Sequence, residues 1–102
     1  MAARTIISAQ AAGSSTGVEL SNPNREDLPI TRAIQVTGTF GGSTVTVELS
    51  LDNSTWATQD KTDAKILTCT ASAYAVITTV GRVWVRITVT GGAGQSVNLL
   101  TN

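Results

Sequence analysis

Alternation of apolar and polar residues around residues 39–56 constrains what this chain can fold into more than any other feature. Within residues 44–51 the apolar side chains occupy every second position: Val45, Val47, Leu49 and Leu51. Successive side chains of a β-strand point to opposite faces, so this pattern is typical of a strand with one buried face. The polar residues Asp52, Asn53 and Ser54 interrupt the pattern and Trp56 resumes it. The sequence therefore predicts a hairpin here.

The same pattern continues through most of the chain after residue 29. The predicted strands cover residues 30–37, 44–51, 55–59, 65–70, 74–80, 82–90 and 96–101. They are rich in Thr and Val, which favour extended backbone. Glycine-rich turns are expected at residues 38–42 and 91–94. Short strands separated by such turns predict an all-β fold, a single β-sandwich or jelly-roll-like domain of about seven to eight strands.

The first 29 residues have a different character. Two short extended segments, residues 4–8 and 18–20, flank the small polar residues 10–17, and a loop with two prolines follows. We therefore divide the chain into an N-terminal arm and loop, residues 1–29, and a β-sandwich domain, residues 30–102. The arm either ends as an edge strand of its own domain or reaches a neighbouring subunit. In the second case Arg4, Ile6 and Ile7 would make the contact, and deleting residues 1–9 would weaken association without unfolding the domain.

Composition argues against several classes of partner. Seven basic and seven acidic residues cancel, whereas a protein that binds nucleic acid normally carries a basic excess. No apolar run approaches the ~20 residues needed to span a membrane, and the first residues lack the apolar core of a signal peptide. We therefore expect no nucleic-acid partner, no membrane partner, and synthesis in a cytoplasm.

The residues that carry most catalytic and metal chemistry are scarce. The chain has no histidine, and Cys69 is its only cysteine. A Ser-His-Asp or Cys-His arrangement, the common zinc sites and an internal disulfide therefore cannot form. Cys69 lies in phase with Leu67 and is expected to pack in the core. The loop with Asp60 and Asp63 has too few oxygen ligands for calcium. We expect no catalytic residues, no metal, no cofactor and no enzymatic activity.

Trp84 and Arg86 are the strongest candidates for a binding surface. In residues 82–90 the apolar side chains of Val83, Val85, Ile87 and Val89 share one face. Trp84 and Arg86 then lie on the other face, and these two residue types are enriched at binding hot spots. Two alternatives remain open. Both sheet faces could be covered, or Arg86 could stack on Trp84 as a local cation–π pair.

Three segments carry a resemblance to a known family. They are the turn GTFGG at residues 38–42, the strand VTVELS with DNSTW at residues 45–56, and GRVWVRITVTG at residues 81–91. This combination resembles small β-sandwich structural proteins of tailed-bacteriophage virions. A short single-domain chain with an N-terminal arm is most similar to the capsid cement (decoration) proteins among them.

The resemblance implies a structural function, without catalysis. A cement protein binds the major capsid protein on the outer capsid surface of the virion, often as a homotrimer, and stabilises the capsid. No catalytic or metal-binding residue is carried over from such proteins. One alternative is a phage tail, neck or baseplate component. Another, from a different class, is a carbohydrate-binding β-sandwich that would use Trp84 as its platform.

Overall fold

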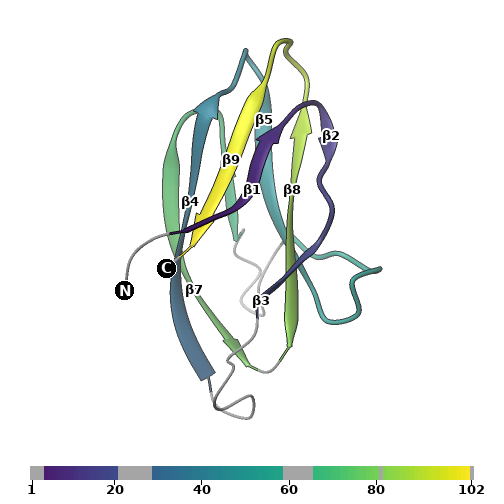
Figure 1. Cartoon of the computed structure of the whole chain (residues 1–102), viewed down its shortest axis with the longest axis vertical. Helices are drawn as coiled ribbons and strands as arrows, with labels where there is room; N and C mark the ends of the chain where they lie inside the picture. The colour runs from purple at the N-terminus through teal and green to yellow at the C-terminus, as the bar shows by residue number, and fades with distance from the viewer. Residues whose placement is uncertain (1–3, 21–28, 59–65, 81, 102) are drawn as a thin grey trace.

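The structure is a computed structural model and describes residues 4–20, 29–58, 66–80 and 82–101 (Figure 1). These residues form two antiparallel sheets that pack face to face. In spatial order, the four-stranded sheet contains β1 (Arg4–Gln10), β9 (Ser96–Thr101), β4 (Pro29–Thr39) and β7 (Ala73–Val80). The five-stranded sheet contains β2 (Gly13–Ser14), β8 (Val83–Thr90), β5 (Thr44–Ser50) and β6 (Leu67–Cys69), with β3 (Val18–Leu20) also paired to β8. The predicted all-β sandwich is confirmed.

Alternation along the strands fills the space between the two sheets. On β8 the four predicted apolar residues are all buried, and on β5 Val45 and Val47 face them from the neighbouring strand. The opposite sheet contributes Ile34, Val36, Val97 and Leu99 from its two central strands. Because each buried side chain is every second residue of its strand, the polar residues between them face outward. Among the described residues, no helix is long and apolar enough to cross a membrane.

Neighbours in a sheet are mostly distant in the sequence. β4 pairs with β7 and β9, and β5 pairs with β8, so most connections cross from one sheet to the other. The prediction of a strand at residues 55–59 is wrong for residues 55–58, which form only a single bridge between Ala57 and Leu49, and residue 59 lies outside the described residues. The reason is local. Asp52 accepts hydrogen bonds from the backbone N–H groups of Ser54 and Thr55, which bend the chain into a loop.

The two glycine-rich turns lie against each other at one end of the sandwich. The backbone N–H of Ala93 donates to the carbonyl of Gly41 over 3.0 Å. Gly41, Gly42, Gly91, Gly92 and Gly94 all have positive φ angles, so the predicted turns at 38–42 and 91–94 are confirmed. The contact joins the β4–β5 connection to the β8–β9 connection.

Residues 4–20 are part of the sandwich, unlike the arm expected from the sequence. β1 pairs with β9, with Arg4 opposite Thr101, and both β2 and β3 pair with β8 (Figure 1). The physical reason is burial, because Ile7 and Leu20 lie in the common core. The structure thus matches the first alternative for this segment, an edge strand of its own domain. Residues 1–3 and 21–28 of the predicted arm lie outside the described residues.

Candidate protein-interaction surface

The outward side of the five-stranded sheet brings Trp84 and Arg86 together with charged residues from other strands. The register places Glu19 of β3 and Ser50 of β5 on either side of Trp84, and Glu48 of β5 opposite Arg86. Side chains directly opposite each other on one face lie within contact distance. We call this surface the Trp84 face and define it by six residues: Glu19, Glu48, Trp56, Arg82, Trp84 and Arg86.

One half of the Trp84 face is an ion pair with an aromatic ring beneath it. Nη2 of Arg82 lies 2.5 Å from Oε2 of Glu19, and Nε of Arg82 donates to the same oxygen over 2.8 Å. The guanidinium carbon of Arg82 is 5.6 Å from the centroid of the Trp84 ring, a cation–π contact. The Arg82 side chain is 59% exposed, so this half of the surface remains accessible to a partner.

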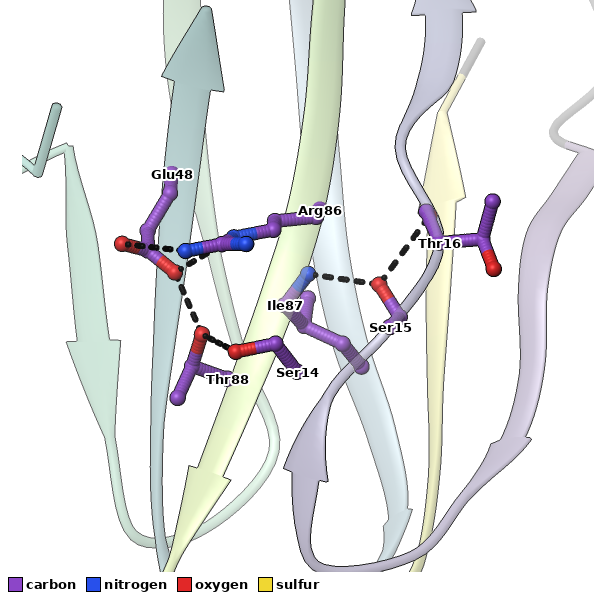
Figure 2. A network of polar contacts seen from close by, with 7 residues as sticks. All are labelled: Ser14, Ser15, Thr16, Glu48, Arg86, Ile87 and Thr88. Atoms are coloured by element: carbon purple, nitrogen blue, oxygen red, sulfur yellow. Dashed lines mark hydrogen bonds and ion pairs between the residues drawn. The ribbon is translucent and has the colours of Figure 1, made fainter. Parts of the chain in front are cut away.

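The other half is more deeply buried. Nε of Arg86 donates to Oε1 of Glu48 over 3.0 Å, and the Arg86 guanidinium stacks on Trp56 at 4.5 Å from the ring centroid. The hydroxyl of Thr88 donates to the same Glu48 oxygen. Figure 2 shows the Glu48 carboxylate connected to both Arg86 and Thr88. The sequence interpretation that Arg86 stacks on Trp84 is wrong, since Arg86 reaches across to β5 while Arg82 covers Trp84.

The N-terminal segment is bound to β8 beside this ion pair. Ser14 and Thr88 share a hydroxyl–hydroxyl hydrogen bond of 2.9 Å. Because the Thr88 proton goes to Glu48, Ser14 is the donor of that bond. Ser15 makes two further bonds to Ile87. Its hydroxyl accepts from the backbone N–H (Figure 2), and its own N–H donates to the carbonyl over 2.8 Å. A continuous polar network therefore joins residues 14–15 to β8 and β5.

The predicted site residues fall into two separate places. Trp84 and Arg86 are half-buried on the outward side of the five-stranded sheet, as the alternation predicts. Ile6 and Ile7 are on β1 in the other sheet, where Ile7 is only 7% exposed and Ile6 packs against the core. Ile7 is thus a core residue of its own chain rather than an exposed contact residue. The side chain of Arg4 lies outside the described part of the structure.

Sequence reasoning missed four members of the surface: Glu19, Glu48, Trp56 and Arg82. For Glu48 the alternation did indicate an outward position, because it lies on the polar face of its strand as Arg86 does on β8. Bringing the two together requires the β5–β8 register, which the sequence does not reveal. Trp56 carried no such signal, since it belongs to a loop whose path depends on Asp52.

These observations define an all-β sandwich with a preorganised Trp–Arg surface on one sheet. Within the described residues, no three side chains of His, Cys, Asp or Glu come close enough together to hold a metal ion. Comparison of the chain with models of protein families, with curated proteins and with solved structures gave no match.

Proposed function

We propose that the protein is a structural virion protein, a cement (decoration) protein that binds the major capsid protein on the outer surface of a phage capsid and stabilises the shell. In this proposal it is made in the host cytoplasm and acts by contact area, without catalysis or a cofactor. The observation that carries the proposal is the Trp84 face. The resemblance of residues 38–42, 45–56 and 81–91 to phage virion proteins supplies the class of partner.

The geometry of the Trp84 face suits protein recognition. Trp and Arg dominate binding hot spots because they combine a large contact area with a polar group. Here Glu19 and Glu48 hold Arg82 and Arg86 in place before any partner arrives. Side chains that are already ordered lose less conformational entropy on binding, so more of the contact energy remains as affinity.

A stable complex needs more contact than these six residues provide. Specific interfaces bury about 1,200–2,000 Å² in total, so the partner would also have to cover neighbouring parts of the sandwich. Several copies bound through one oligomer would strengthen weak individual contacts by raising the effective concentration of each binding site. The resemblance favours a homotrimer for this role.

Co-sedimentation with capsid shells that lack the protein tests the proposal. Wild-type protein should bind the shells to saturation at high copy number. Trp84→Ala and Arg82→Ala should each weaken binding at least tenfold, as loss of a hot-spot residue does. The matched control is Gln35→Ala, an exposed residue on the outward side of the other sheet, which should bind like wild type. Circular dichroism of each variant establishes that it is folded.

Two results would replace the proposal with one of its alternatives. Binding only to tails or necks, in few copies per particle, would favour a tail, neck or baseplate component. Binding to a glycan array that Trp84→Ala abolishes would favour a carbohydrate-binding sandwich. The structure gives a reason to expect no glycan signal, because carbohydrate platforms use an open ring face and Arg82 lies over the ring of Trp84.

A further inference from the structure

β7 forms one edge of the four-stranded sheet. It pairs with β4 over eight consecutive residue pairs without a bulge, from Pro29 opposite Val80 to Val36 opposite Ala73. Figure 1 shows it as the outermost strand of its sheet. In the part of the chain that the structure describes, no segment pairs with its other side. A row of backbone N–H and C=O groups on that side is therefore open to another strand.

The other sheet edges differ from β7 in length or regularity. β1 has two register shifts against β9, and β2, β3 and β6 contain only two or three residues each. Short strands and bulges are the usual means by which proteins protect an edge from pairing with another chain. Of the described edges, β7 is the long and regular one.

The side chains of β7 also lack the usual protection. Its eight residues, AYAVITTV, include no charged residue, proline or glycine. Tyr74 and Val76 point outward and are 71% and 61% exposed. They lie opposite Gln35 and Ala33 of β4, which are uncharged as well. Charged side chains and prolines normally prevent an exposed edge strand from pairing with another chain. A strand without them, such as β7, favours such pairing.

We propose that β7 pairs with β7 of a second copy of this chain. The two strands would run antiparallel about a twofold axis and join two four-stranded sheets into one continuous sheet. The observations favour this occupant because a strand without charge meets no repulsion from its own copy. An antiparallel pair also presents the same surface on both sides, as a twofold axis requires. Pairing of β7 with β1 of another copy would instead place a regular strand beside one with two register shifts.

The size of the contact sets its strength. Eight extended residues span about 27 Å, and a single strand pair adds little contact beyond the edge itself. Interfaces below about 1,200 Å² belong to weak or transient complexes. The dimer should therefore dissociate on dilution. This inference stands apart from the proposed function and differs from the trimer that the resemblance implies.

Light scattering of the purified full chain across a dilution series tests the inference. The mass of wild type should rise with concentration from 10.5 kDa, the mass of one chain, towards twice that value. Val76→Lys should stay at the mass of one chain at every concentration, because the twofold axis brings the two lysines close together. Gln35→Lys is the matched control. It places the same charge on the same sheet face one strand further in, so it should dimerise like wild type.

Hydrogen exchange gives a second measurement that needs no variant. Backbone amides of β7 should exchange more slowly at high concentration than at low concentration, while those of β1 should not change. The inference is overturned if wild type remains a single chain up to its solubility limit, or forms a trimer. It is equally overturned if Val76→Lys still dimerises, or if Gln35→Lys dissociates the dimer as well, since the contact would then be the sheet face.

Discussion

At the scale of single residues, Asp52 determines how the chain leaves β5. Its Oδ1 atom accepts hydrogen bonds from the Thr55 N–H, the Ser50 hydroxyl and the Ser54 N–H, at 2.8, 2.8 and 2.9 Å. Hydrogen bonds to a carboxylate stabilise its charged form. They lower the pKa of Asp52 from 3.8 to about 2, and the bond from Thr55 has the largest effect.

The lowered pKa makes part of the stability depend on pH. The contribution of Asp52 is fully present above pH 3.8, its ordinary pKa, and is lost as the pH falls towards about 2. Asp52→Asn keeps an acceptor oxygen but does not titrate, so it should melt at a lower temperature than wild type at pH 5. That difference should shrink steadily between pH 4 and pH 2. Thermal unfolding followed by circular dichroism measures it. A difference that is constant over this range would contradict the assignment.

Residue types and alternation predicted which side chains face outward, but not which ones they contact. Trp84 and Arg86 lie where the alternation places them, and Cys69 packs against the core, where burial raises the pKa of its thiol. The cation–π partners were not predictable from the sequence. A long arginine side chain can reach residues two positions away or a neighbouring strand, and Glu48 and Trp56 decide that choice for Arg86.

At the scale of elements, the two glycine-rich turns are in close contact through their backbones. A Cβ added at Gly92 would lie 2.4 Å from the Gly41 carbonyl oxygen and 2.7 Å from the Ser43 nitrogen. Both atoms belong to the backbone of the β4–β5 turn, so neither can move aside cheaply. The Ser43 hydroxyl also donates to the Phe40 carbonyl over 2.5 Å, which fixes that turn from within.

Two glycine substitutions separate backbone strain from this contact. Gly92 and Gly94 have similar φ angles of 66° and 70°, but a Cβ at Gly94 would meet nothing within 4 Å. Gly94→Ala should cost about 1 kcal/mol for the left-handed conformation alone. Gly92→Ala should cost about 2–3 kcal/mol, the upper part of the range typical of single substitutions. Urea denaturation measures both. Equal losses would mean that the two turns are not in close contact.

Strands with strong alternation were predicted well, and those that depend on distant partners were not. β5 and β8 lie within a residue or two of their predicted ranges because β-branched residues alternate through them. β2 was missed, since Gly13 and Ser14 carry no apolar pattern and are extended only by pairing with β8. Residues 55–58 do not form the expected strand because the hydrogen bonds of Asp52 bend the chain and override its preference for extended backbone.

At the scale of the whole molecule, β1 completes the sandwich. It covers one side of β9, and its Ile7 is packed among core residues of both sheets. Strand order was not predictable from the sequence, because equally apolar strands can be ordered in many ways. For that reason residues 4–20 were assigned to an arm, although their Ile7 and Leu20 form part of the core.

The role of β1 can be measured with a pair of substitutions on one strand. Ile7→Ala should lower the free energy of unfolding by about 2–5 kcal/mol, the usual cost of removing a large buried side chain. Thr5→Ala, at an exposed position of the same strand, should change it by less than about 0.5 kcal/mol. Chemical denaturation of both variants tests this. If they are equally stable, Ile7 does not belong to the core.

The pairing of β1 with β9 also fixes the order of events when the chain is made. β1 is synthesised before β9, its partner in the sheet, which follows about 90 residues later in the chain. Until then β1 has no neighbour in its sheet, and the edge of β4 that pairs with β9 is uncovered. Contacts between such distant segments must overcome a large loss of chain entropy and form slowly. The four-stranded sheet can therefore be completed only after β9 has been synthesised and can pair with β1.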